Sequence, residues 1–148
     1  MAFRYPFQSI LRLRQSLERQ EEQRLFAIAA TVARLRLELE EFEGSRMERW
    51  RIASEEMMAG SSGAVLQFAA LCEANAATVH SKLRVELADA EQQRLKQLYV
   101  YQQARQKREI FEKLRDRQEE NYDREAVRHE QEQADDSFLM RSLGKVAD

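Results

Sequence analysis

The sequence is poor in the residues that end helices and form turns. It contains four glycines and one proline in 148 residues, whereas an average protein has about 7% glycine and about 5% proline. This scarcity excludes folds built from many short elements joined by tight turns. The single cysteine, Cys72, excludes a disulfide within the chain. Together with His80 and His129, which lie far apart, it makes no metal-ligand spacing.

Long apolar runs and catalytic motifs are also lacking. No stretch approaches the roughly 20 apolar residues of a membrane span, and the N-terminal arginines are not followed by the apolar core of a secretory signal. There is no glycine-rich phosphate loop and no GxSxG, HExxH or CxxC motif. Carboxylate pairs are abundant, but two packed helices offer no cleft to orient them. We therefore expect no enzyme, no catalytic residue, no cofactor and no metal.

What the chain does contain is charge and helix-forming residues. Charged residues make up 34% and hydrophobic residues 43% of the sequence, a mixture typical of long helices and coiled coils. Between residues 10 and 42, apolar residues recur three and four apart, which predicts a coiled-coil seam. The step of eight from Leu17 to Leu25 predicts local unwinding of that seam, and Leu11 is expected to lie outside it. The predicted seam consists of Ile10, Leu13, Leu17, Leu25, Ile28, Val32, Leu35, Leu39 and Phe42.

The segment GSSG, residues 60–63, is the only cluster of turn formers. Gly60 suits a left-handed helix end, and Ser61 or Ser62 suits the start of the next helix. The predicted fold is all-α, a long antiparallel two-helix coiled-coil hairpin in one domain over 1–148. Its first helix covers about 7–58, its turn about 59–63 and its longer second helix about 64–140, before a frayed tail. The predicted stripe of the second helix includes Leu66, Ala69, Ala76, Leu83, Leu87, Ala90, Leu98, Tyr101, Phe111 and Leu114.

Charge is segregated along the sequence. Residues 1–24 contain five arginines and three glutamates, and residues 92–117 contain eight Lys/Arg and three Asp/Glu. Residues 119–136 contain eight Asp/Glu and two arginines. A hairpin brings the first two segments side by side, which predicts a basic end followed by an acidic tip. Residues beyond about 115 are expected to lack a partner helix. For individual charges, ordinary solvated faces with pairs four residues apart are the alternative.

Two apolar groups exceed what the seam requires. Phe3, Tyr5 and Phe7 surround the only proline, and they either staple the first helix or reach a partner. Phe68, Leu71 and Cys72, in the stretch VLQFAALC, lie just after the turn. An exposed apolar patch beside a loop is a common docking site.

The stretch FRYPFQSILRLRQSLERQEE resembles the opening of FliJ-type flagellar export proteins. The single loop near residue 60, the longer second helix and the segment EQEQADDSFLMR agree with this resemblance. The resemblance implies a non-enzymatic coiled-coil stalk, similar to the stalk of rotary ATPases, that serves flagellar assembly, motility and chemotaxis. It also implies a cytoplasmic location at the inner face of the membrane. The implied partners are the ring of the flagellar export ATPase, the export gate membrane protein and other export chaperones.

The resemblance also implies where the partners bind. The ring contact falls on Phe3–Arg24 and on residues 103–122, and the gate contact falls on Phe68 with Leu71 or Cys72. The candidate ring residues are Phe3, Tyr5, Phe7, Arg12, Arg14, Arg19, Arg105, Arg108 and Arg115.

Three other classes of protein compete with this hypothesis. A structural coiled coil could self-associate through the unpartnered part of the second helix. The equivalent stalk of a virulence-type secretion system has the same architecture. A nucleic-acid binder could use the basic stretch 92–117, with Tyr99 and Tyr101 stacking on bases, but the adjacent acidic segment would repel phosphate. We therefore expect no nucleic acid and no membrane insertion.

Overall fold

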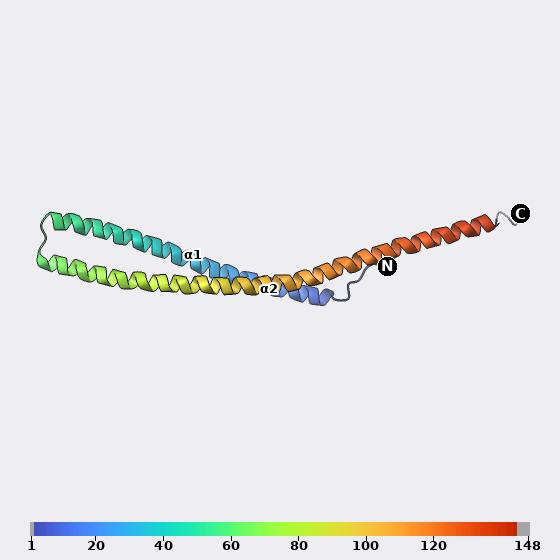
Figure 1. Ribbon diagram of the computed structural model, residues 1–148, viewed down its shortest axis with the longest axis horizontal. Helices are drawn as coiled ribbons and strands as arrows, with labels where there is room; N and C mark the ends of the chain where they lie inside the picture. Colours follow the sequence, from blue (N-terminus) through green and yellow to red (C-terminus); the bar gives the residue numbers. More distant parts are fainter. Residues whose placement is uncertain (1, 145–148) are drawn as a thin grey trace. The chain divides into compact units, whose positions relative to one another are not determined.

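The computed structural model describes residues 2–144 as two long helices joined by one turn (Figure 1). Helix α1 covers Gln8–Met58 and helix α2 covers Gly63–Gly144. No strand occurs among these residues. The predicted fold class, an all-α helical hairpin with a longer second helix, is confirmed.

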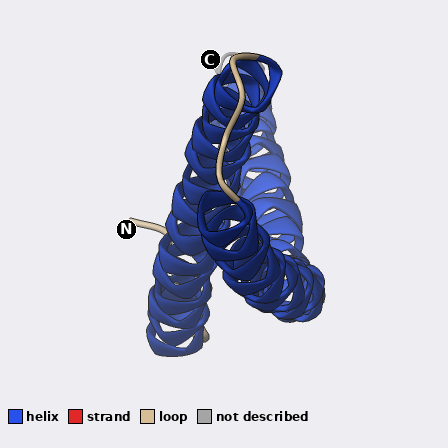
Figure 2. Cartoon of the chain, turned by 90° about the vertical axis from the view of Figure 1, so that its left-hand side faces the viewer, coloured by secondary structure: helices blue, strands red, loops and turns tan. Residues whose placement is uncertain are grey.

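The turn consists of residues 59–62 and connects the neighbouring ends of the two helices (Figure 2). Gly60 has a φ angle of 93°, a conformation that costs glycine little and ends α1 as the sequence predicts. The hydroxyl of Ser61 donates a hydrogen bond to the carbonyl of Glu56 at 2.9 Å, so it completes the end of α1. The carbonyl of Ser62 accepts the first bonds of α2, from the amides of Val65 and Leu66.

The chain divides into two compact units. Residues 20–102, which we call the hairpin unit, contain the turn and the adjoining halves of both helices. The described residues 2–19 and 103–144, which we call the terminal unit, contain the start of α1 and the rest of α2. A single domain over the whole chain remains a prediction.

The core of the hairpin unit is a small apolar cluster. Val32, Leu35 and Ala90 are buried together, and Leu87 packs against them. Burying one large aliphatic side chain stabilises a fold by about 1.5–3 kcal/mol. The guanidinium of Arg36 lies 2.6 Å from the carboxylate of Glu91. Both side chains are largely exposed, so this ion pair contributes little beyond orienting the helices.

Helix α2 presents an uninterrupted heptad seam. Sixteen successive positions, spaced alternately four and three apart, are buried or half-buried. This spacing is the signature of two packed coiled-coil helices. The positions are Ala69, Glu73, Ala76, His80, Leu83, Leu87, Ala90, Arg94, Gln97, Tyr101, Ala104, Arg108, Phe111, Arg115, Gln118 and Tyr122.

The predicted stripe of α2 is wrong at three leucines. Leu66, Leu98 and Leu114 are 40%, 37% and 36% exposed. Polar seam residues such as Gln97 and Arg115 stand next to two of them in the sequence. The stripe predicted from the leucines therefore lies one residue away from the side of α2 that faces α1.

Helix α1 also has an uninterrupted seam, which corrects the predicted one near its start. Leu11 is fully buried, whereas Leu13 is 57% exposed and Ile10 and Leu17 are each 37% exposed. The predicted step of eight and its unwinding are wrong, because three polar residues occupy seam positions and conceal the seven-residue repeat. The seam consists of Leu11, Arg14, Glu18, Glu21, Leu25, Ile28, Val32, Leu35, Leu39, Phe42 and Arg46.

In the terminal unit, α2 keeps a partner for longer than the sequence predicts. The ring of Phe3 lies 5.7 Å from the ring of Tyr122, so the residues before α1 extend the contact past residue 115. Beyond Tyr122, residues 123–141 are all exposed while the helix continues to Gly144.

Candidate partner-binding sites

The aromatic residues at the start of the chain pack on α2. Tyr5 is 6% exposed, and its hydroxyl donates a hydrogen bond to the carbonyl of Phe111 at 3.1 Å. Phe3 packs against Tyr122. Phe7 stands edge-on to Tyr5 with 5.8 Å between ring centres and is 39% exposed. Of these three candidate ring residues, Phe7 therefore offers the most free surface.

A charged cluster occupies the seam of the terminal unit. The Nε of Arg108 lies 2.5 Å from the Oε2 of Glu18, and these side chains are only 19% and 15% exposed. Arg108 also forms an ion pair with Glu112 and lies 3.8 Å from Glu109. Burial lowers the pKa of Arg108, but the hydrogen bond to Glu18 and the three nearby carboxylates outweigh it, so its pKa is raised. The guanidinium of Arg108 is therefore already paired with carboxylates of the same chain.

The other arginines predicted for the ring contact differ in whether they form ion pairs within the chain. Arg105 lies 2.9 Å from Glu109, and Arg115 lies 2.9 Å from Asp116. Arg14 is half-buried, and its buried Nε has no hydrogen-bond acceptor in the described part of the chain.

A set of exposed basic side chains remains without ion pairs in the terminal unit. Five of those nearest the packed part of the two helices form no ion pair with any of residues 2–144: Arg12, Arg19, Lys107, Lys113 and Arg117. The sequence analysis did not name the last three as site residues. Heptad position distinguishes these three from Arg108 and Arg115, which fall on the seam, but not from Arg105, which lies off the seam and pairs with Glu109. We call this set the basic surface.

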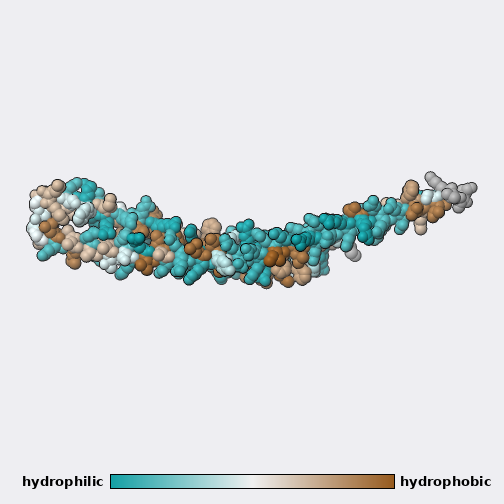
Figure 3. Space-filling view, viewed as in Figure 1, coloured by the Kyte–Doolittle hydropathy of each residue, from teal (hydrophilic) through white to brown (hydrophobic). Residues whose placement is uncertain are grey.

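Past Tyr122, α2 carries an acidic exposed segment and then an apolar one. Arg124 and Arg128 pair with glutamates one turn away, at 3.6 and 3.1 Å, which leaves most of the acidic residues without a cation. Phe138 and Met140 are 71% and 79% exposed. The sequence analysis assigned no role to this apolar end, whose hydrophobic surface is visible along α2 in Figure 3.

The candidate gate residues lie at the start of α2, in the hairpin unit. Phe68 and Leu71 are 69% and 70% exposed, and Cys72 is an exposed free thiol. All three side chains are therefore accessible at the surface. The hydrophobic surface near the turn is visible in Figure 3.

Over residues 2–144, no helix is long and apolar enough to cross a membrane. The same residues contain no group of three side chains arranged to hold a metal ion.

The fold and these surfaces define a helical-hairpin protein with exposed charged and apolar contact surfaces. Residues 3–146 match the family described as Flagellar FliJ protein, and the chain belongs to this family. It is thus a component related to flagellar export, associated with the flagellar export apparatus. No curated protein and no solved structure matched the chain.

Proposed function

We propose that the chain is a non-enzymatic stalk that binds the ring of the flagellar export ATPase through its terminal unit. In the same proposal, residues just after the turn bind the export gate at the inner face of the membrane. Family membership supports the setting, and the basic surface is the observation that carries the ring contact. Binding of other export chaperones stays a prediction.

The charges of the terminal unit suit a reversible contact. Its seam arginine Arg108 is neutralised by carboxylates of the same chain, whereas the basic surface keeps its charge for carboxylates of a partner. Exposed charged contacts accelerate association and form and break readily. One stalk cannot contact six subunits of a ring equally, so it favours some ring conformations and couples to nucleotide state.

The ring contact is tested by reversing charge on exposed residues only. Arg12→Glu with Arg19→Glu, and separately Lys113→Glu with Arg117→Glu, should reduce stimulation of ATP hydrolysis by the export ATPase. The matched control is Lys82→Glu with Arg84→Glu in the hairpin unit, where both side chains are exposed and form no ion pair with described residues. If the charge-reversed variants stimulate ATP hydrolysis as strongly as the control variant, the ring contact is excluded.

The gate contact is tested separately. Phe68→Ala with Leu71→Ala should reduce co-purification with the export gate protein and leave ATPase stimulation intact. Cys72→Ser distinguishes whether the thiol contributes. The control is Phe26→Ala, which removes a 74% exposed phenylalanine from α1. Retained co-purification of the double variant would place the gate contact elsewhere.

A further inference from the structure

The residues that leucine spacing predicts for the start of the α1 seam form an apolar stripe that the hairpin leaves exposed. Ile10, Leu13 and Leu17 each precede a seam residue, and they are 37%, 57% and 37% exposed. On α2, Ile110 and Leu114 also precede seam residues, and they are 63% and 36% exposed. In the terminal unit, each helix therefore carries an apolar stripe one residue before its seam.

The two stripes lie on the same side of the terminal unit. A residue that precedes a seam position is turned about 100° away from it, because an α-helix has 3.6 residues per turn. The contacts of Tyr5 with Phe111 and of Glu18 with Arg108 run in opposite directions along the two helices, so the packing is antiparallel. An antiparallel pair has an approximate two-fold axis across its seam, which keeps the preceding residues of both helices on one side. Together they form what we call the leucine face: Ile10, Leu13, Leu17, Ile110 and Leu114.

The leucine face is flanked by positive charge and not by carboxylates. Lys107 and Arg117 also precede seam positions, so they stand at the two ends of the α2 stripe. Both side chains are exposed, and neither forms an ion pair with any of residues 2–144. Residues 2–19 and 103–117 contain four carboxylates, one in the seam and three directly after seam positions: Glu18, Glu109, Glu112 and Asp116.

The opposite side of the terminal unit has charges of both signs. Arg12, Arg19 and Arg105 follow seam positions, so they lie on the same side as the three exposed or half-buried carboxylates. One pair forms there between Arg105 and Glu109, at 2.9 Å. The two sides of the terminal unit therefore suit different partners, and the leucine face suits an acidic one.

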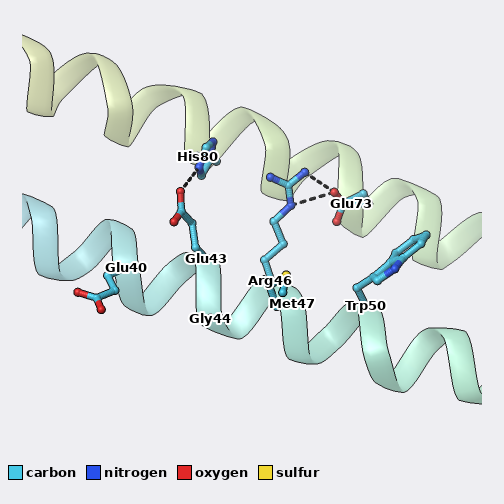
Figure 4. A pocket seen from close by; sticks show the side chains of 8 residues that line it. All are labelled: Glu40, Glu43, Gly44, Arg46, Met47, Trp50, Glu73 and His80. Carbon is cyan, nitrogen blue, oxygen red and sulfur yellow. Dashed lines mark hydrogen bonds and ion pairs between the residues drawn. The ribbon is translucent and has the colours of Figure 1, made fainter.

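The cavities of the hairpin unit do not select a partner by charge in this way. Two cavities, of about 590 and 370 Å³, flank Trp50. Figure 4 shows that charged groups at the larger one pair across the seam, Glu43 with His80 at 2.8 Å and Arg46 with Glu73 at 2.9 Å. The other charged residues that line the two cavities have opposite signs: Glu40 and Arg49.

We propose that the leucine face binds an amphipathic helix of a partner protein, with a row of aliphatic residues and carboxylates at both ends of that row. A helix laid against two antiparallel helices contacts them through side chains spaced three and four apart. Its carboxylates would pair with Lys107 and Arg117, which have no anion within the described chain.

A second copy of the chain fits the leucine face poorly. Two leucine faces would bring Lys107 and Arg117 of each copy close to the same cations of the other, which is unfavourable. The end of α2 has apolar residues at 138–140, but its carboxylates all come before them and Arg141 comes after them. This end could therefore neutralise one cation of the face and would bring a further cation to the other.

The probe is a fluorescently labelled peptide of about 14 residues, four helical turns, with leucines in one row and glutamates at both ends of that row. Its fluorescence anisotropy is measured as the full chain is added. Binding should saturate, and it should weaken as salt is added because exposed charge pairs are screened. A matched peptide with lysine in place of each glutamate should not bind.

Substitution of exposed apolar residues tests where the peptide binds. Leu13→Gln with Ile110→Gln should weaken binding by about tenfold, which corresponds to 1.4 kcal/mol. The matched control is Leu37→Gln with Leu95→Gln in the hairpin unit, where the side chains are 57% and 61% exposed. The control should leave binding unchanged.

Charge reversal separates the two sides of the terminal unit. Lys107→Glu with Arg117→Glu should weaken peptide binding by a similar factor. Arg12→Glu with Arg19→Glu reverses two exposed cations of the opposite side and should leave binding unchanged. The ring contact is tested by ATP hydrolysis and the leucine face by peptide binding to the chain alone, so either proposal can fail without the other.

Three results would overturn the proposal: no saturable binding of the glutamate peptide, equal binding of the lysine peptide, and equal weakening by the control substitutions in the hairpin unit. Sedimentation of the chain without peptide tests the second copy. A dimer that dissociates on Leu13→Gln with Ile110→Gln would assign the leucine face to self-association instead.

Discussion

Charged residues at seam positions distinguish this hairpin from an apolar coiled coil. Glu18 and Arg108 lose most of their hydration, and the ion pair with its added carboxylates recovers part of that cost. Removing one partner would leave the other half-buried and unpaired, which is costly, whereas replacing both by apolar residues often is not. These positions therefore contribute little net stability.

Tyr5 contributes more, because it combines burial with a satisfied hydroxyl. We predict that Tyr5→Phe lowers the free energy of unfolding by about 0.5–1.5 kcal/mol, the usual net value of one hydrogen bond. Tyr5→Ala should cost about 3 kcal/mol or more, since it also removes a buried ring. Urea unfolding followed by circular dichroism measures both.

The control for this prediction is Phe7→Ala, because Phe7 is 39% exposed and its loss should cost clearly less than that of Tyr5. Equal costs at the two positions would mean that the start of the chain does not pack on α2 in solution.

At the scale of the element, the apolar pattern of α1 predicts a helix but misplaces its buried side. Ile10, Leu13 and Leu17 form a plausible seam in isolation, yet Leu11 is the residue that is fully buried. The seven-residue repeat from Leu11 to Arg46 becomes visible only when polar residues are admitted to the seam. Two of them, Glu18 and Arg46, form ion pairs with Arg108 and Glu73 of the other helix, which the pattern of one helix does not contain.

This register predicts which leucine stabilises the terminal unit. Leu11→Ala removes a fully buried side chain and should cost about 2–5 kcal/mol. Leu13→Ala removes one that is 57% exposed and should cost well under half as much. Both substitutions leave a good helix former, so helix propensity is matched. Denaturant midpoints, compared at equal slope, show which substitution costs more stability. A greater loss of stability for Leu13→Ala would support the register that the leucine spacing predicts.

At the scale of the whole molecule, the sequence predicts the hairpin because few residues can interrupt a helix. One cluster of turn formers leaves room for one turn, and its position makes the second helix longer. The two cavities beside Trp50 are not predictable in this way. They depend on which side of each helix faces the other, and alanine at Ala69 and Ala76 fits a tight seam as well as an open one. Candidate contact residues such as Arg108 were predicted from the family resemblance and the charge pattern, which do not show that they pair within the chain.

The described residues after Tyr122 should be dispensable for stability. Removing everything after residue 124 deletes a stretch of α2 in which residues 125–141 are all exposed, so little buried apolar surface is lost. We predict an unchanged urea midpoint together with a smaller helical signal in circular dichroism. The contrasting variant lacks the residues before Gln8, and its midpoint should fall because it loses Tyr5. A midpoint that falls equally in both would mean that the end of α2 packs on the chain. An unchanged midpoint would show that this length of helix does not stabilise the hairpin.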